Sequence, residues 1–330
     1  MDRDEPGPAV ATPRDPEELA AAVRRHGRVV LVVNAGSRRT ARVRPRLARM
    51  LADAGVRLMR DVTVVAPGAL PEALREALAL RPDLLVVGGG DGTVTTAAAM
   101  LAHRDVALGV LPLGTTNNVA RSLGLPLTVR GAVRALAAAR VAEVDLGRLR
   151  LADGDPDGDV LFANLVSLGV SVEVARRAPR RLKRWLGRAA YAATALAVLP
   201  GHRPVTVTLT EGASTRRFVT HQLNLANGRF HAGRPLAREA AIDDHRLHVY
   251  RLGGASRASL ALATARHVLA GARRSEGDDA FLVTAAVSVD TDPPLALDVD
   301  GEVRGRTPFS VSVAESALRV VVADRPVPAR

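Results

Sequence analysis

The stretch from Leu84 to Val94 constrains the fold of this chain more than any other part of the sequence. Four apolar residues, Leu84–Val87, predict a short buried strand. Four glycines and one aspartate follow within five positions, and the alanine-rich segment 95–102 then predicts a helix. Glycines let a backbone approach a phosphate closely, and a helix start offers unpaired N–H groups and a positive dipole end. The stretch therefore predicts a phosphate site at a strand–turn–helix junction.

Two polar residues of this stretch need roles of their own. Thr93 is expected either to cap the helix or to contact a phosphate. Asp91 is an acid beside the expected phosphate, and two negative groups repel one another. Its position therefore favours a metal ion or a hydroxyl between the carboxylate and the phosphate. The alternative is a plain strand–helix turn that uses glycine for its backbone angles, but four glycines around one aspartate favour the phosphate site.

Composition narrows the partners of the chain. Its 330 residues suffice for two domains, and an apolar fraction of 47% supports real cores. The net charge of +12 predicts affinity for something anionic, such as a nucleotide, a nucleic acid or an acidic membrane surface. Aromatic residues make up only 2%, which disfavours stacking platforms for single-stranded nucleic acid. The absence of cysteine excludes disulfides and thiolate nucleophiles.

Neither the N-terminal stretch nor the apolar runs predict a membrane-spanning or secreted protein. Residues 1–16 are acidic and proline-rich and have no apolar core, so we expect a flexible lead-in and no signal peptide. The apolar run 189–200 is too short to span a bilayer. These features predict a cytoplasmic protein.

Residues 28–143 alternate predicted strands with predicted helices. This alternation favours a parallel sheet with helices on both faces. Polar turns follow three of the strands, at Asn34, at 88–93 and at 114–118, and they would share the carboxyl edge of the sheet. Ligands of such sheets bind at that edge.

Beyond residue 144 the pattern changes to short β-type segments, which predict an antiparallel sandwich or barrel. Single strands are expected at 161–166, 217–226 and 281–290, and two separate strands at 309–313 and 317–322. Helical inserts are expected at 171–199 and 255–271. The chain therefore divides into a lead-in with a first helix at 1–27, an α/β domain at 28–143 and a β-rich domain at 144–330.

Two motifs together resemble a known family. Gly-Gly-Asp-Gly-Thr at 89–93 is followed by the block Leu111–Pro126, and both resemble the diacylglycerol kinase catalytic-domain family, to which sphingosine and ceramide kinases are similar. The first motif alone also occurs in NAD kinases and is similar to phosphofructokinases, but the second block favours the lipid kinases. The resemblance covers nearly the whole chain from residue 28. Further matching segments are Asp145–Gly147, Asn164–Gly169, Asn227–Arg229, Ile242–Asp244 and Asp300–Glu302.

The resemblance implies a two-domain kinase. Its N-terminal domain would be α/β with a parallel sheet, as in phosphofructokinases and NAD kinases, and its second domain a mainly antiparallel β-sandwich. ATP and Mg²⁺ would bind to the first domain, and the lipid would enter between the two. Asp91 and Glu302 would be catalytic, with Asp91 organising magnesium and Glu302 acting as general base on the lipid hydroxyl. The implied nucleotide-binding residues are Asn34, Gly89, Gly90, Gly92, Thr93, Gly114, Thr115, Thr116 and Asn117.

The sequence departs from the family pattern at two positions. Asp243 and Asp244 match an acidic pair that supports a structural magnesium in the family, but His245 stands where glycine is usual. A metal at Asp244 and a solvated acidic turn therefore both remain open. Ala35 replaces a usual proline, while Asn34 is retained. Without the resemblance, Asp300–Glu302 would be interpreted as an ordinary turn.

The segment Arg176–Arg188 carries seven basic residues, no acid and Trp185. A basic amphipathic helix with a tryptophan favours transient contact with a membrane surface. The alternative is a solvated helix face with Trp185 in the core.

These observations predict an ATP- and Mg²⁺-dependent lipid kinase that acts on diacylglycerol or a related lipid, peripheral at the inner membrane face. A soluble NAD kinase-like enzyme and a nonenzymatic lipid- or nucleotide-binding protein of the same fold are the alternatives. The net charge is the only feature that would support a nucleic-acid partner, so no such partner is expected. The acceptor lipid and any homo-oligomer are left open.

Overall fold

The computed structural model describes residues 14–25, 27–36, 38–66, 68–154, 158–177, 202–231, 234–235, 240–252 and 281–323. Within the described part, the first predicted insert begins with α7 (Val170–Arg177). The remainder of that insert up to residue 199, the second insert at 255–271 and residues 1–13 lie outside the described residues.

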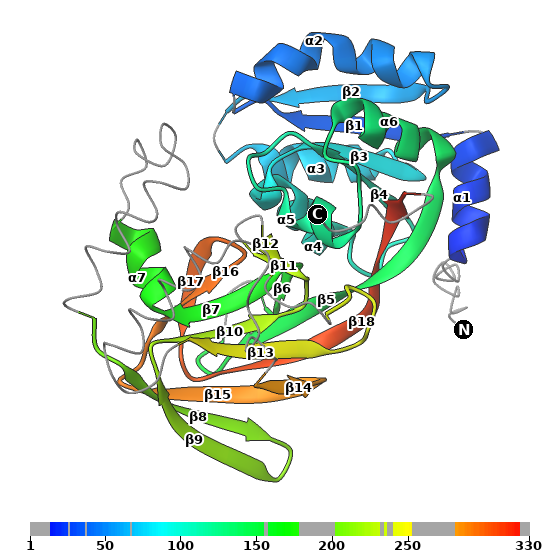
Figure 1. The fold of residues 1–330 in the computed structure, drawn as a ribbon. Coiled ribbons are helices and arrows are strands. Elements are labelled where there is room, and N and C mark those ends of the chain that lie inside the picture. Colours follow the sequence, from blue (N-terminus) through cyan, green and yellow to red (C-terminus); the bar gives the residue numbers. More distant parts are fainter. Residues whose placement is uncertain are drawn as a thin grey trace, which may run out of the picture.

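The first half of the chain is an α/β layer built on a parallel sheet (Figure 1). Its strands are ordered β2-β1-β3-β4 and run parallel, as predicted. The strands are β1 (Val29–Asn34), β2 (Leu58–Val64), β3 (Leu84–Gly89) and β4 (Ala107–Pro112). The helices are α1 (Pro16–Arg25), α2 (Arg38–Asp53), α3 (Leu70–Ala79), α4 (Asp91–Leu101), α5 (Asn118–Ser122) and α6 (Val129–Ala138).

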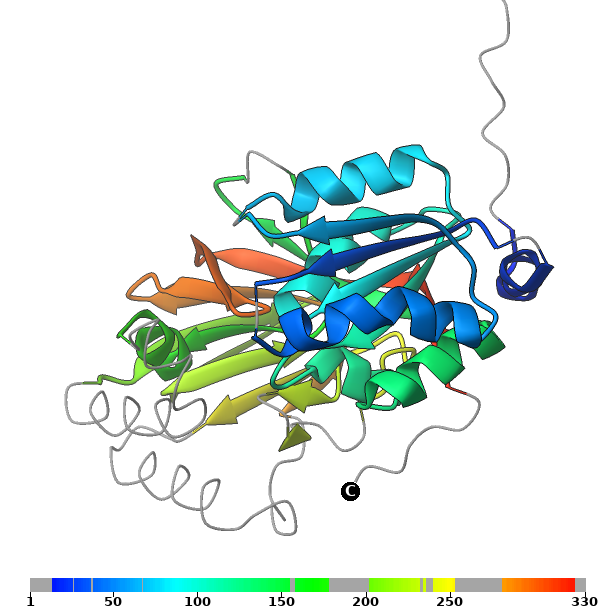
Figure 2. The same cartoon turned by 90° about the horizontal axis from the view of Figure 1, so that it is seen from above.

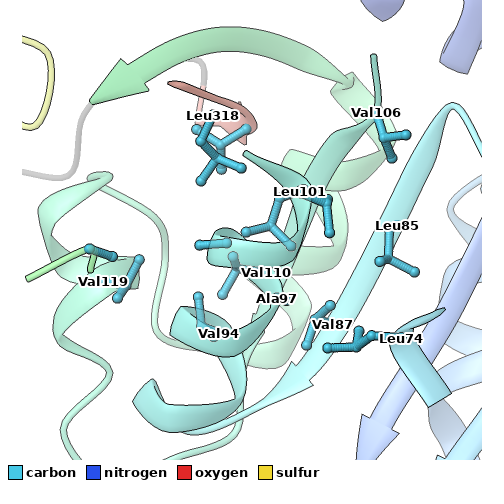
Figure 3. Packing of buried hydrophobic residues seen from close by; sticks show 14 of the residues in the cluster. Leu74, Leu85, Val87, Val94, Ala97, Leu101, Val106, Val110, Val119 and Leu318 are labelled. Carbon is cyan, nitrogen blue, oxygen red and sulfur yellow. The ribbon is translucent and has the colours of Figure 1, made fainter. Parts of the chain in front are cut away.

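Helices bury both faces of this sheet, so its central strands are apolar along their whole length. Val30 and Val32 of β1 point into the core under α3, α4 and α5, which Figure 3 shows from close by. Leu31 and Val33 point the opposite way, into the core under α1, α2 and α6. A strand buried on both faces has this uninterrupted apolar sequence because each alternate side chain meets a helix.

The second half is a sandwich of two mainly antiparallel layers. One layer continues the first sheet through β18, β15, β8 and β9, and the other has the order β14-β13-β10-β7-β16-β17. Leucine and valine side chains from both layers form the core between them. The strands are β5 (Arg140–Leu151), β6 (Val160–Phe162), β7 (Leu165–Gly169), β8 (Val205–Glu211), β9 (Ser214–Thr220), β10 (Gln222–Ala226), β11 (Phe230–His231), β12 (Arg234–Pro235), β13 (Leu247–Leu252), β14 (Leu282–Thr284), β15 (Ala286–Asp292), β16 (Ala296–Val299), β17 (Glu302–Arg306) and β18 (Phe309–Val322).

Strands β5 and β18 connect the two halves. They pair antiparallel along their length, while β18 also pairs with β15 near its start and with β4 near its end. The predicted division between residues 143 and 144 falls inside β5. Near its end, β18 pairs with β4 of the parallel sheet through Val320 and Leu108. The α/β layer and the sandwich therefore share a continuous sheet.

Four strand predictions were wrong. The segment 161–166 is two strands in different sheets, with a break at 163–164, and the segments 217–226 and 281–290 likewise divide between the two sheets. The segments at 309–313 and 317–322 form a single strand, interrupted in its pairing with β5 by a bulge near Ala314. The core lies between the two layers, so the apolar side chains of a strand in either layer point into it. The alternation of apolar residues therefore continues unchanged where the chain crosses from one sheet to the other.

A buried ion pair holds the amino end of β3. Asp83 is 3% exposed, and its carboxylate accepts hydrogen bonds from Arg14 and Arg28, each with an N–O distance of 2.9 Å. Burial raises the pKa of Asp83, but the two guanidinium groups outweigh it, so the net pKa lies below the ordinary value of 3.8. The pair therefore stabilises the fold above about pH 4, and this stabilisation is lost as the pH falls through the lowered pKa.

We predict that Asp83→Asn lowers the free energy of unfolding by about 1–3 kcal/mol at pH 7, because two guanidinium groups lose a charged acceptor. Urea unfolding measures this loss, and the difference from the parent protein should shrink below about pH 4. Asp159→Asn, which breaks the more exposed pair with Arg150, is the control and should change stability by less than about 1 kcal/mol. A loss for Asp83→Asn that is independent of pH would contradict the assignment.

Candidate active site

The polar turns at the carboxyl edge of the parallel sheet lie against one another, as predicted. Asn34, at the end of β1, donates a hydrogen bond from Nδ2 to Oγ1 of Thr93 in α4, with a distance of 3.1 Å. Thr116, which follows β4, donates from Oγ1 to Oδ2 of Asp91 at 2.7 Å. Three loops that are distant in sequence therefore form one cluster around the start of α4.

The start of α4 carries no side-chain cap. Gly90 is the N-cap residue with an extended backbone (φ −92°, ψ −174°), and no side chain accepts from the first turn. The N–H groups of Thr93 and Val94 donate to the carbonyl oxygen of Gly90. Helix geometry leaves the N–H groups of Asp91 and Gly92 without an acceptor inside the helix, and the positive end of the helix dipole lies at the same point.

One of the two roles predicted for Thr93 is wrong. Helix α4 begins at Asp91, four residues earlier than the expected 95, so Thr93 lies within its first turn and does not cap it. Its side chain is buried, and its hydroxyl accepts the hydrogen bond from Asn34. The alanine-rich segment alone did not reveal this earlier start, because glycine and aspartate are weak helix formers.

The glycines of the cluster serve different purposes. A Cβ atom on Gly89 would lie 2.5 Å from the side chain of Thr93, and one on Gly114 would lie 2.5 Å from Cα of Gly90. These two glycines let the loops approach one another. A Cβ atom on Gly92 would meet nothing within 4 Å, and the residue needs no left-handed backbone angle. The fold therefore does not require glycine at position 92, which faces open space beside the uncapped helix start.

Asp91 connects α4 to the loop after β4. Besides the bond from Thr116, its Oδ1 accepts a hydrogen bond from the backbone N–H of Val119 at 3.2 Å. An ionised carboxylate has about four lone-pair positions, so these two bonds leave acceptor capacity on both oxygens. Asp91 can therefore hold the loop and still bind a cation.

Asn117 closes the loop after β4. It is 4% exposed and has a left-handed backbone (φ 50°). Its Oδ1 accepts from the N–H of Gly114 at 2.9 Å, and its Nδ2 donates to the carbonyl oxygen of Gly114 at 3.1 Å. The side-chain amide of Asn117 thus shapes the loop from within, whereas Thr115 at the tip is exposed.

Asp300 belongs to the same motif as Glu302, but the sequence alone assigns it no role of its own. Its carboxylate accepts three backbone hydrogen bonds, from Ala163 (2.7 Å), Asn164 (2.9 Å) and Leu165 (3.0 Å). These bonds hold the break between β6 and β7. Burial raises the pKa of Asp300 to about 6, the three hydrogen bonds oppose the rise, and the negative charge of Asp91 adds to it. Ala163, whose N–H donates to Asp300, lies in the same hydrophobic core as Val94 of α4, so the turn at 300–302 lies on the α4 side of the parallel sheet.

Glu302 lies two residues further on, at the start of β17. Its side chain is 65% exposed, and Arg304 is its hydrogen-bonded partner at 3.4 Å within the described part of the chain. Exposed pairs of this kind contribute little to stability. The structure therefore places Glu302 beside the anchored Asp300 and leaves its carboxylate accessible, without a direct contact to Asp91.

The acidic turn at 243–244 is tied into the protein by hydrogen bonds. The carboxylate of Asp244 accepts from the N–H groups of Ala241 and Arg246, and Nε2 of His248 lies 2.9 Å from its Oδ2. His245 has a left-handed backbone (φ 56°), which suits the glycine usual in the family, and its ring contacts the buried Asp145 at 2.9 Å. Among the described residues, no group of three or more histidine, aspartate or glutamate side chains is arranged to hold a metal ion.

Comparison with known proteins agrees with this arrangement. The model for the diacylglycerol kinase catalytic domain matches residues 28–149, and the model for the YegS C-terminal NAD kinase beta sandwich-like domain matches residues 164–322. The chain therefore belongs to the family of lipid kinases that combine these two domains.

Two curated relatives carry names from this family. A protein of Stenotrophomonas maltophilia named "Probable lipid kinase YegS-like" is 30% identical over 265 residues, which cover 74% of this chain and 80% of the relative. A diacylglycerol kinase of Staphylococcus epidermidis is 27% identical over 307 residues, which cover 90% of this chain and 92% of the relative.

A solved structure shows the same fold. The crystal structure of a diacylglycerol kinase from Bacillus anthracis superposes with a TM-score of 0.72 at 21% identity, covering 90% of this chain and 97% of that chain. The predicted α/β domain with its parallel sheet and the antiparallel β-sandwich are thus confirmed. Within the described residues, none of the helices has the length and apolar character needed to cross a membrane.

We predict that alanine has opposite effects at two glycines of the cluster. Gly89→Ala should lower the free energy of unfolding by about 1–3 kcal/mol, because its Cβ atom overlaps Thr93. Gly92→Ala should leave stability unchanged or raise it by up to about 1 kcal/mol, because its Cβ atom enters open space at a helical position. Urea unfolding of both variants measures the difference, and equal losses would contradict the described geometry.

Proposed function

We propose that this chain is an ATP- and Mg²⁺-dependent lipid kinase that phosphorylates the hydroxyl of diacylglycerol or a related lipid. The observation that carries the proposal is the uncapped start of α4. Gly92 faces open space there, although the fold itself does not require glycine at this position. In the proposal, residues 28–143 bind the nucleotide and residues 144–330 bind the lipid.

The start of α4 suits the phosphates of ATP. The free N–H groups of Asp91 and Gly92 and the helix dipole favour an anion at this point. A side chain at position 92 would occupy the space that the anion needs. Asn34 orients Thr93 beside this position, and Gly89, Gly90 and Gly114 let the surrounding loops approach closely. The exposed Thr115 and the neighbouring Thr116 would contact the nucleotide from the loop after β4.

The acidic residues of the site fit a magnesium ion bound together with phosphates. Mg²⁺ usually takes one or two carboxylates and completes its shell with water and phosphate oxygens. Asp91 supplies one carboxylate with unused acceptor capacity beside the proposed phosphate position. Bound there, the ion would neutralise charge that develops on the transferred phosphoryl group. A second ion at Asp244 is a weaker proposal, because that carboxylate already accepts bonds from its own turn.

Glu302 is the proposed general base. Phosphoryl transfer to an alcohol forms a bond between the lipid oxygen and phosphorus and releases the hydroxyl proton, which the Glu302 carboxylate would accept. Its exposure leaves room for a substrate hydroxyl, and the backbone bonds of Asp300 keep the turn in place. Asp300 acts as a positioning residue in this account and does not touch the substrate.

We propose that the protein works in the cytoplasm at the inner face of the membrane, where a lipid substrate and ATP are both within reach. We propose peripheral contact, for which the basic segment Arg176–Arg188 remains a candidate. Residues 178–188 lie outside the described part of the chain, so this candidate rests on its sequence. No nucleic acid partner is proposed.

The test of the proposed function is a transfer assay with radiolabelled ATP and Mg²⁺ in mixed micelles. The acceptors are diacylglycerol, monoacylglycerol, phosphatidylglycerol, ceramide and sphingosine, with NAD as the soluble alternative. We expect labelled product from a lipid and none from NAD. Gly92→Ala should retain its fold and lose activity by about 100-fold or more, as expected when a phosphate contact is blocked. Label on NAD alone, or no label on any acceptor, would contradict the proposal.

We predict that Glu302→Gln lowers kcat by about 100- to 10,000-fold, because the amide cannot accept the proton. Its melting temperature should stay close to that of the parent protein, since the side chain is largely exposed. Glu315→Gln, at another exposed glutamate of the same domain, is the matched control and should keep its activity. Retained kcat in Glu302→Gln would remove the residue from the proposed role.

A further inference from the structure

Five exposed arginines lie on the outward faces of α2 and α6. Arg42, Arg46 and Arg49 follow one another at intervals of four and three residues on α2, and Arg130 and Arg134 are four apart on α6. Residues at these spacings share one side of a helix. We refer to these five side chains together as the arginine face.

The two helices lie side by side on the same surface of the parallel sheet (Figure 2). Leu47 and Leu51 of α2 are fully buried in the core beneath them, and Val133 and Leu136 of α6 are buried in the same core. Because both helices turn their apolar sides toward one sheet surface, the arginines on their opposite sides face the same direction. The arginine face is therefore one surface shared by two elements.

The described residues do not compensate the charge of this surface with ion pairs. None of the five arginines forms an ion pair among the described residues, whereas Arg44 of α2, which points toward β2, pairs with Asp61 at 2.7 Å. Helix α6 contains no acidic residue, and α2 contains only Asp53 at its last position. Neither helix carries an exposed large apolar side chain within the described part of the chain. A partner would thus be held by charge, without insertion of apolar groups.

We propose that the arginine face docks the protein on the anionic surface of a phospholipid membrane. This inference rests on the proposed function, because a lipid kinase must reach a hydroxyl held in a bilayer. Helix α2 begins directly after the turn at Asn34, so the arginine face borders the sheet edge that carries the candidate active site. Docking through this surface brings that edge toward the lipid headgroups.

A membrane fits this surface better than a nucleic acid. The five charges lie on the outward sides of two adjacent helices, a broad surface that matches the plane of a bilayer. Recognition of single strands would require aromatic side chains for base stacking, and the chain has few aromatic residues in total. Binding to anionic lipid headgroups requires only the clustered positive charge that is present here.

Binding of the arginine face to a membrane should depend on the fraction of anionic lipid and on the salt concentration, because charge alone holds the two together. Each arginine close to an anionic leaflet strengthens binding by up to about fivefold, so removal of all five should weaken it by about 100- to 3,000-fold. Binding should need anionic lipid and should weaken steeply as salt shortens the screening length. Vesicles of neutral lipid should not retain the protein.

The test is co-sedimentation of the full chain with vesicles of phosphatidylcholine, with and without phosphatidylglycerol. The variant replaces the five arginines by glutamine. The matched control replaces five arginines that are exposed elsewhere on the described chain, and it lowers the net charge equally: Arg81, Arg104, Arg203, Arg217 and Arg246. We expect the control to bind anionic vesicles nearly as the parent protein does and the variant to lose binding. Equal binding by all three proteins, or equal losses in both variants, would overturn the inference.

Two further measurements separate this inference from the proposed function. Lipid phosphorylation in neutral detergent micelles needs no docking, so the five-residue variant should keep its activity there and lose it on anionic vesicles. If the parent protein phosphorylates no lipid in micelles, the proposed function fails, while vesicle binding still reports on the surface. Tight binding of duplex DNA at physiological salt, lost with the same five arginines and without vesicle binding, would reassign the surface to nucleic acid.

Discussion

The pairing of β5 with β18 is the constraint on which the rest of the structure depends. These strands run through both halves of the molecule, so the parallel sheet and the sandwich are parts of one hydrogen-bonded layer. At the bulge in this pairing, the buried Asp145 accepts hydrogen bonds from the backbone N–H groups of Ser316 and His245. Loops from the second half are thereby fixed at the junction of the two halves, where the N–H of His103, just after α4, donates to the carbonyl oxygen of Ala317.

The site gathers negative charge in a protein that is strongly basic overall. Asp91 ties α4 to the loop after β4, and Asp300 ties the β16–β17 turn to the break between β6 and β7. The raised pKa of Asp300 reflects burial and the nearby charge of Asp91. Burial makes the charged form of Asp300 costly, and a nearby cation would offset that cost. In our proposal, magnesium and the phosphates of ATP complete the balance of charge.

The sequence predicted the parts of this arrangement that depend on local patterns. Alternating apolar segments and helices gave the parallel sheet, and glycine-rich turns after its strands located the cluster around Asp91. What remained hidden depends on contacts between distant residues. The break at Ala163 needs the carboxylate of Asp300, and the distinction between Gly89 and Gly92 depends on what surrounds each of them. The arginine face likewise emerges only when α2 and α6 are placed side by side.

The central claim is that ATP places its phosphates at the start of α4. The most direct measurement is a titration with ATP and Mg²⁺ followed by NMR of the protein labelled with ¹⁵N at its glycines. The account predicts that the amide signals of Gly90 and Gly92 shift most, because their N–H groups lie at or beside the proposed phosphate position. Saturable binding of ATP that leaves both of these signals unmoved would contradict it.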